Sequence, residues 1–356
     1  VIDAQKLISS TSDQDIIAYA EDCYKKIFGV RFANVKPHTR VIANKIVLES
    51  ILLPKDKILA FKEQKNELEV YEEECYVELS KYNTVYFNID EKMEQINYDD
   101  IKNKALEERP KIIYINTSFY PRLIDYEELY NIANEINAYL VVDISEIAGL
   151  IVTNLLNNPC KYAHITILST HGVLKGLQGG IILSNNSELI KNIDNNIDSY
   201  QGSPLINMIA SKVVVANNIL NNDFIIYQKQ VLKNAKVLCD VFKESDVKVI
   251  YNGTDNHEVI IDVKESFSMT GKEAETILKS INIFCKKTLV PYDETTPYIT
   301  SGIKFSTLVM TSKGLKEKDF FEITKIIVKA LKNNKDKALL NNLKAQVEEL
   351  LTELLF

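Results

Sequence analysis

The stretch KIIYINTSFYPRLIDYEELYNIANEINAYLVVD, residues 111–143, alternates short apolar runs with an amphipathic one. Lys111–Asn116 and Tyr139–Asp143 are short and rich in Ile and Val, which is typical of buried strands. Tyr126–Asn137, between them, repeats its apolar residues at helical spacing. This alternation predicts an α/β layer built on a mainly parallel, buried sheet.

The pattern continues outward from this stretch and then changes. His164–Ser169 and Gly180–Ser184 predict two more strands, and Asp13–Phe28 and Ile42–Leu53 predict earlier helices. After about Asp223 the segments become mostly helical, which predicts a smaller α+β domain. We therefore expect a large domain over residues 1–222, ending in a helix from Ser203 to Asn217, and a small C-terminal domain over 223–356. In the small domain the predicted helices are Asp223–Glu244, Gly271–Ser280, Gly314–Lys332 and a docked terminal helix Leu339–Phe356, and the predicted strands are Lys248–Tyr251 and Glu258–Val263.

Composition excludes several classes of partner. The 356 residues carry 42 Lys+Arg against 49 Asp+Glu, a formal net charge of -7, so no overall positive field attracts DNA, and RNA binding has no support from charge. No apolar run approaches the roughly 20 residues of a membrane-spanning helix. The five cysteines and four histidines lack the close spacing of metal ligands, so we expect no protein-made metal site.

The segment VVDISEIAGL, residues 141–150, is similar to the Val-Asp-x-Ala-His-Ile-Ala-Gly-Leu run of serine hydroxymethyltransferases. The resemblance covers nearly the whole chain and implies the aminotransferase-like fold type I of pyridoxal-phosphate enzymes, with a mostly parallel seven-stranded sheet in the large domain. It also implies glycine-serine interconversion in one-carbon metabolism, and dimers whose sites use both subunits. The other matching segments, in family order, are Ser118–Arg122, Ser169–Gly172, Gly253–His257, Thr270–Glu275 and Thr300–Lys304.

The position of the catalytic lysine departs from the family motif. In the family a lysine follows Thr-His at once and holds pyridoxal phosphate as a Schiff base. Here Gly172 follows His171 and carries no amine. The nearest amine belongs to Lys175, which matches a family arginine and is expected to keep a structural role. The resemblance therefore implies a chain that does not hold pyridoxal phosphate covalently and has no intact catalytic set.

The positions that contact the cofactor phosphate in the family also differ. A Ser-Gly-Ser cup after Pro-His is replaced by Thr39, Arg40 and Val41, and we expect the large cation to fill it. Alternatively, Arg40 binds a different small anion through its two-pronged guanidinium. The Gly-Gly-Pro with which a neighbouring subunit touches the phosphate becomes Gly202 and Ser203, followed by proline.

Two substrate-side positions change charge or geometry, while three others are kept. Glu146 replaces a family histidine, and Lys304 replaces the arginine that clamps the substrate carboxylate. The stretch Lys62–Lys81 lacks the Gly- and His-rich composition that holds cofactor and folate in the family. The kept residues are Asp143, the family's partner of the pyridine nitrogen, His171 and Ser118. They are interpreted as buried hydrogen-bonding groups or, alternatively, as a relic pocket for a flat aromatic ligand.

Three functions follow as hypotheses. The first is a dimeric pseudoenzyme that regulates or scaffolds an active paralogue, as a homodimer or a heterodimer, without pyridoxal phosphate. The second is a binding module for another small anion, a folate-like ligand or RNA in the relic cleft. The third is an active hydroxymethyltransferase with a rearranged site. By analogy with divergent second copies of metabolic enzymes, the mitochondrion is favoured over the cytoplasm.

Overall fold

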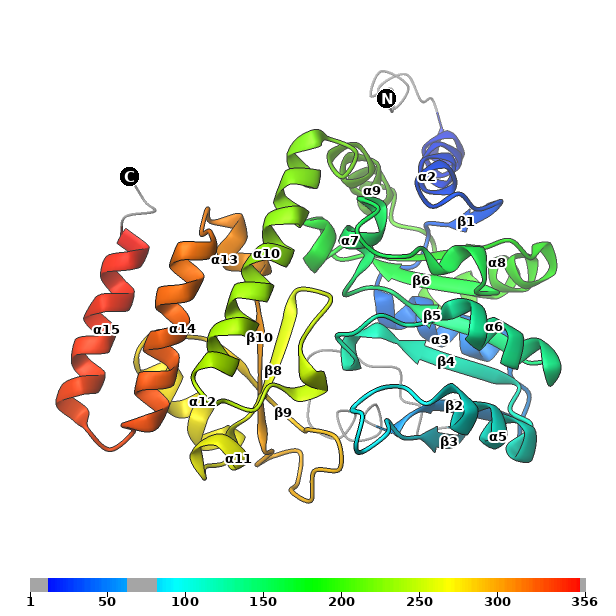
Figure 1. Ribbon diagram of the computed structural model, residues 1–356. Helices are drawn as coiled ribbons and strands as arrows, with labels where there is room; N and C mark the ends of the chain where they lie inside the picture. Colours follow the sequence, from blue (N-terminus) through cyan, green and yellow to red (C-terminus); the bar gives the residue numbers. More distant parts are fainter. Residues whose placement is uncertain (1–11, 63–81, 353–356) are drawn as a thin grey trace. The chain divides into compact units, whose positions relative to one another are not determined.

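The computed structural model describes residues 12–62 and 82–352 (Figure 1). Contacts divide the chain into two units. One comprises Val1–Asn88, Asn97–Tyr120 and Ile124–Ile225, and the other Ile89–Ile96, Pro121–Leu123 and Ile226–Phe356. The division near Ile225 lies close to the expected start of the small domain. The two short segments that join the second unit were assigned to the large domain by the sequence analysis.

The first unit is built on a seven-stranded, mostly parallel sheet, which confirms the predicted α/β fold class. The strand order is β1-β7-β6-β5-β4-β2-β3. The five strands from β6 to β3 run parallel, and β7 and β1 are antiparallel to their neighbours. The strands are β1 (Phe32–Asn34), β2 (Lys57–Phe61), β3 (Asn83–Phe87), β4 (Ile112–Asn116), β5 (Tyr139–Asp143), β6 (Ile165–Ser169) and β7 (Gly180–Ser184).

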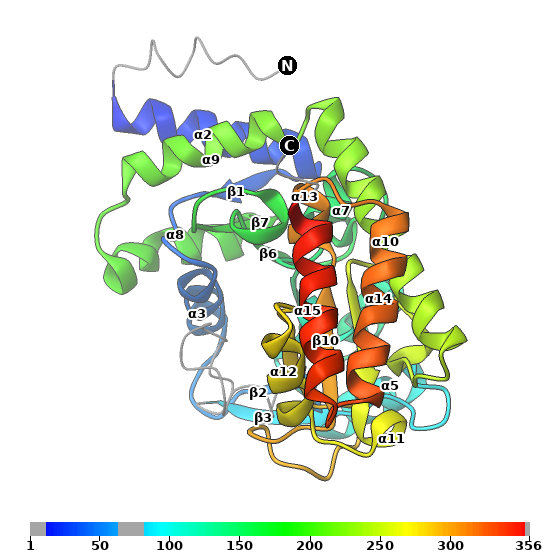
Figure 2. The same cartoon turned by 90° about the vertical axis from the view of Figure 1, so that its left-hand side faces the viewer.

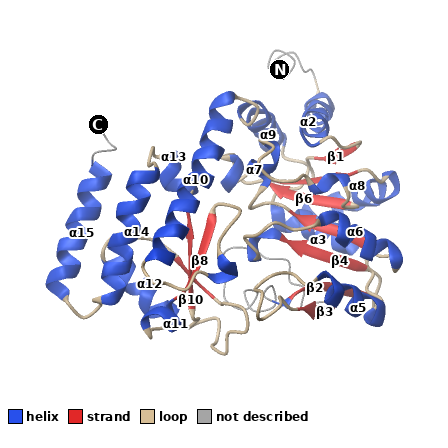
Figure 3. Ribbon diagram, viewed as in Figure 1, coloured by secondary structure: helices blue, strands red, loops and turns tan. Residues whose placement is uncertain are grey.

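The central strands are apolar because they are covered on both faces. Every residue of β4, β6 and β7 is buried, and helices lie on either side of the sheet (Figure 3). On one face α3 and α8 pack against the strands through an isoleucine-rich cluster. The helices of this unit are α2 (Asp13–Phe28), α3 (Arg40–Ile51), α5 (Tyr98–Glu108), α6 (Tyr126–Glu135), α7 (Ala148–Val152), α8 (Ser187–Gln201) and α9 (Ile206–Asn218).

Helix α3 begins two residues earlier than its apolar stripe suggested. Thr39 has extended backbone angles, and its side chain accepts a hydrogen bond from the Ile42 N–H, so it is the N-cap. The capping hydroxyl therefore makes Arg40 the first residue of α3.

The second unit is α+β, with an antiparallel sheet in the order β8-β10-β9. Its terminal helix packs on α14 and buries Leu343 and Val347, so it is docked as expected (Figure 2). The elements are α10 (Asn222–Glu244), which starts in the first unit, β8 (Glu258–Asp262), α11 (Val263–Phe267), α12 (Gly271–Ser280), β9 (Lys286–Thr288), β10 (Gly302–Ser306), α13 (Leu308–Ser312), α14 (Glu317–Lys332) and α15 (Lys337–Thr352).

One strand prediction in this unit was wrong, and one helix begins later than predicted. Lys248–Tyr251 is not a strand: only Val249 forms an isolated bridge, and the chain then turns into a 3-10 helix in which Tyr251 has φ 58°. The predicted helix from Gly314 begins instead at Glu317, after a separate short helix α13. Among the described residues, no helix is long and apolar enough to cross a membrane.

Short polar contacts explain why two outlying segments belong to the second unit. Arg122 donates from Nε to Asp255 Oδ2 at 2.8 Å and from Nη1 to the Tyr251 carbonyl at 2.8 Å. Glu94 pairs with the Lys248 ammonium at 2.5 Å. These bonds join residues far apart in sequence, which apolar periodicity does not reveal.

Candidate active site

The candidate site lies where the parallel strands of the first unit end. Asn116 closes β4 and is paired in register with Asp143, the last residue of β5. Because parallel strands bring their carboxyl ends to one edge, these polar side chains meet there, at the usual location for a ligand in such a sheet. The Asp143 side chain is 0% exposed.

Arg40 reaches this edge from the first turn of α3 and occupies the centre of the group. Its Nε donates to Asp143 Oδ2 at 2.7 Å, and Nη1 lies 3.3 Å from Glu146 Oε1. Nη2 donates to Asn116 Oδ1 at 3.0 Å and to Ser118 Oγ at 3.1 Å. All three guanidinium nitrogens are therefore engaged by groups of the protein itself.

The Asp143 carboxylate also accepts hydrogen bonds from other residues. Asn44 Nδ2 donates to Oδ2 at 2.7 Å, and the N–H and Oγ of Ser145 donate to Oδ1 at 2.9 and 2.6 Å. Asn44 in turn accepts from the Tyr114 hydroxyl at 2.9 Å. Asp143 thus belongs to a closed network in which both carboxylate oxygens have donors.

This network strongly favours the charged form of Arg40. Burial by itself lowers the pKa of the guanidinium, but Asp143, and after it Glu146, outweigh burial and raise that pKa above its ordinary value. Burial, with the nearby Asp143 carboxylate, raises the pKa of Tyr114 well above its ordinary value, so its hydroxyl stays a donor. The group is a buried ion pair with matched hydrogen bonds.

The predicted phosphate positions have taken structural roles or lie at the surface. The Thr39 hydroxyl accepts the Ile42 N–H at 3.1 Å as the cap of α3. Val41 lies half-buried in the first turn of α3, Gly202 ends α8 with φ 77°, and Ser203 is exposed. Because the Arg40 guanidinium is already paired with a carboxylate, it binds an added anion poorly. The anion-binding alternative for Arg40 would require Asp143 and Glu146 to be displaced.

A buried lysine that sequence reasoning missed holds the loop leading to Arg40. Lys212, on α9, is 1% exposed. Its Nζ donates to the carbonyls of Val35, Pro37 and Gly180 at 2.6, 2.8 and 2.9 Å. The ammonium thereby ties the loop before α3 to the first residue of β7.

The segment that carries the catalytic lysine in the resemblance is a short 3-10 helix, Gly172–Leu174. Gly172 has φ 72°, and a Cβ placed on it would meet no atom within 4 Å, so the position has space but a left-handed backbone. His171 is exposed, and its N–H donates to Ser169 Oγ at 3.1 Å. Lys175 is also exposed and left-handed, and partial burial lowers its pKa.

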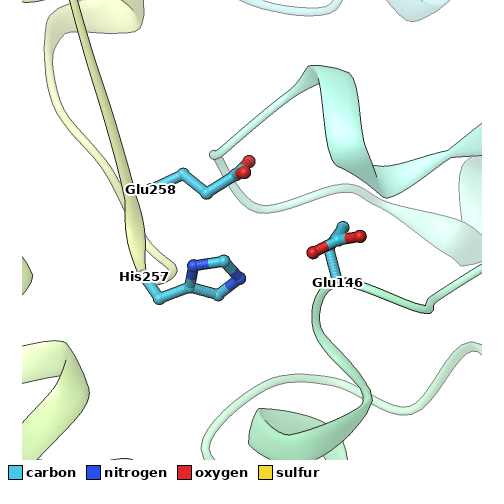
Figure 4. A group of neighbouring side chains, drawn as sticks. All are labelled: Glu146, His257 and Glu258. Carbon is cyan, nitrogen blue, oxygen red and sulfur yellow. The ribbon is translucent and has the colours of Figure 1, made fainter. Parts of the chain in front are cut away.

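Lys304, in the second unit, is also paired within the protein. Its Nζ lies 3.1 Å from Glu258 Oε1 across the β8–β10 pair, with side-chain exposures of 14% and 6%. Figure 4 shows Glu258 beside His257 at the start of β8; Glu146, in the same picture, belongs to the first unit and is described above with Arg40. An acidic residue opening an apolar strand was the signal that sequence reasoning overlooked.

Comparison with known proteins agrees with the resemblance. The family model of serine hydroxymethyltransferase matches residues 13–327. The chain belongs to the serine hydroxymethyltransferase family. In this family the seven-stranded sheet is that of the fold-type-I large domain. The prediction about Lys62–Lys81 falls, apart from Lys62, outside the described residues.

The family depends on pyridoxal phosphate, and the residues of this serine hydroxymethyltransferase homologue do not fit that group. Position 172 has no amine to hold it, and the Thr39 hydroxyl caps a helix. Asp143, the family's partner for the pyridine nitrogen, already carries Arg40 at 2.7 Å. These residues therefore support no catalytic step through pyridoxal phosphate.

Proposed function

We propose that this serine hydroxymethyltransferase homologue is a pseudoenzyme that does not hold pyridoxal phosphate covalently. One observation carries the proposal: Arg40 donates to Asp143, the position that serves the cofactor ring in the family. A ring nitrogen would have to displace a cation already hydrogen-bonded to a buried carboxylate. Breaking such a pair leaves a buried charge without a partner, which is strongly unfavourable.

The pairing of Lys304 with Glu258 supports the same proposal. In the resemblance, position 304 binds the substrate carboxylate, but here the lysine lies 3.1 Å from Glu258. A second carboxylate at this position would meet a charge that is already neutralised and would lose the two-pronged geometry of arginine. The family positions for the pyridine nitrogen and for the substrate carboxylate, Asp143 and Lys304, therefore both hold internal ion pairs.

The chain keeps the family fold, but its candidate site is occupied by its own side chains. Such a protein can still act by binding another protein. We infer that the chain forms a heterodimer with an active paralogue and acts through that contact, as a regulator or scaffold. The buried hydrophobic cores of both units and the docking of α15 on α14 support it, because a chain that keeps its fold can still associate after its catalytic groups are lost. The mitochondrial compartment stays a prediction.

Co-expression tests the proposed function. The chain, carrying an affinity tag, is produced together with an untagged active serine hydroxymethyltransferase of the same organism, and the eluate is analysed by native mass spectrometry and by a turnover assay. We expect a one-to-one complex, and no turnover from the tagged chain purified alone. An unrelated protein with the same tag is the control for capture by the resin. Serine cleavage by the tagged chain alone, or failure of the two chains to associate, contradicts the proposal.

A further inference from the structure

A pocket lies in the first unit, at the sheet edge opposite the Arg40 network. Its volume is about 450 Å³, which is within the range of small-molecule sites. Arg31 and His164 stand directly before β1 and β6, and Ser187 opens α8 just after β7. The Arg40 network, by contrast, gathers where β4 and β5 end, so the two sites occupy different edges of one sheet.

Aromatic side chains form one side of this pocket. The rings of Tyr130 and His164 lie 5.5 Å apart between centroids, and those of Tyr130 and Tyr162 lie 6.5 Å apart. Tyr139 meets His164 edge-on at 5.4 Å, and the Tyr162 hydroxyl donates to Glu127 Oε2 at 2.9 Å. These contacts hold the rings in place, although they are tilted by 36° (Tyr130 and His164) and 50° (Tyr130 and Tyr162), so the pocket has an ordered aromatic side against which one ring of a ligand could pack.

The tautomer of His164, which lines the pocket, is fixed by a backbone contact. Its Nδ1 accepts the Leu140 N–H at 2.9 Å, so the ring proton sits on Nε2. Burial lowers the pKa of this imidazole, which keeps it neutral near pH 7. The fixed tautomer therefore makes Nε2–H the donor of this ring.

Cations and a helix start supply positive potential to the same pocket. Lys161 and Arg31 both line it, and the Arg31 guanidinium is positioned by a hydrogen bond to the Asn185 carbonyl. Asn186 Oδ1 accepts the N–H groups of Glu188 and Leu189. Within the part of the chain that the structure describes, no hydrogen bond of the Ser187 N–H is found, and this donor starts the 15-residue helix α8. The charged residues that line the pocket are Arg31, Lys161 and Glu188, so the lining carries a net positive charge.

We propose that this pocket binds a phosphate monoester joined to a flat ring, the chemistry of a nucleoside monophosphate. The phosphate meets Lys161, Arg31 and the Ser187 N–H, and the ring lies against the wall of Tyr130 and His164. A helix N-terminus and two cations match the oxygen acceptors of a phosphate, and aromatic side chains stack on any planar ring. This site is independent of the proposed pseudoenzyme function.

Calorimetric titration of the full chain with adenosine 5′-monophosphate tests the proposal. We expect saturable one-to-one binding, and roughly 5- to 10-fold weaker binding by Lys161→Gln, because a charge-assisted bond to the phosphate is lost. Ser187→Pro is the second variant: proline is favoured at the first position of a helix, so α8 persists while the backbone donor is removed. It is expected to weaken binding several-fold.

Lys55→Gln is the matched control, because Lys55 is exposed in the loop before β2, away from the pocket-lining strands, and the charge change is the same. Its affinity is expected to equal that of the wild type. Adenosine, which lacks the phosphate, is expected to bind at least 10-fold more weakly than the monophosphate. No binding of the monophosphate at millimolar concentration, or equal binding by Lys161→Gln and Ser187→Pro variants that melt like the wild type, overturns the proposal.

Discussion

Replacing Arg40 with alanine is expected to lower the free energy of unfolding by about 3–5 kcal/mol, the range measured when one partner of a buried ion pair is removed. Asp143, with a fully buried side chain, would keep its donors from Asn44 and Ser145 but lose the Arg40 cation at 2.7 Å. Asn116 and Ser118 would each lose the Nη2 donor as well. The loss should therefore exceed that of any exposed charge pair.

Urea unfolding followed by circular dichroism measures this effect. Lys45→Ala is the matched control, since Lys45 lies on the same helix, is 54% exposed and makes a 4.0 Å surface pair with Glu49. It should cost at most about 1 kcal/mol. The double variant Arg40→Ala/Asp143→Asn removes both charges and should recover part of the loss. Equal destabilisation by Arg40→Ala and Lys45→Ala would show that the pair is not a structural element.

Replacing Lys212 with methionine is expected to be the second most damaging change, at about 2–4 kcal/mol near pH 7. Methionine keeps an apolar stem of similar length, but the carbonyls of Val35, Pro37 and Gly180 lose their shared donor in a buried position. The Pro37 carbonyl still accepts the Gly180 N–H at 3.1 Å. Each buried carbonyl left without a donor costs about 1–3 kcal/mol, and methionine relieves part of this because it buries no charge. Lys55→Met is the exposed control.

The effect of Lys212→Met should grow with pH. Burial lowers the pKa of Lys212 to about 7 in the folded chain, against about 10.4 in an unfolded one. Between these values the unfolded state binds more protons than the folded state, so the stability contributed by Lys212 rises with pH and is smallest below pH 7. Unfolding of wild type and variant at pH 6.5 and pH 9 measures the difference. If the free energies of unfolding of wild type and Lys212→Met differ less at pH 9 than at pH 6.5, the result contradicts the lowered pKa of Lys212.

The sheet of the first unit was predictable because its strands are covered on both faces. Burial on both sides requires continuous apolar runs, and the runs at Tyr139–Asp143 and Gly180–Ser184 match β5 and β7. The strand predicted at Lys248–Tyr251 failed because left-handed backbone at Tyr251 turns the chain, and apolar composition does not report that conformation. Ile89–Ile96 joins the second unit through single polar contacts, which leave no periodic signal.

The sequence predicted which family residues the site has lost, but not which contacts the new residues make. Comparison with the family motif identified Gly172, Arg40 and Lys304 as departures, because each changes the chemistry of one position. An ion pair depends on the distance between side chains in the folded chain. The sequence therefore did not show that Arg40 pairs with Asp143, or Lys304 with Glu258. Lys212 was also missed, since a lysine in an apolar helix looks like a surface residue until its carbonyl partners are placed.

Covalent labelling tests the central claim most directly. The wild-type chain is incubated with pyridoxal phosphate, reduced with borohydride, digested and analysed by mass spectrometry, with the double variant Arg40→Gly/Gly172→Lys as comparison. We predict that no single lysine of the wild type carries a pyridoxyl group at one equivalent per chain, and that labelling is sparse and spread over exposed lysines. One lysine, such as Lys175, labelled stoichiometrically in the wild type would contradict the account.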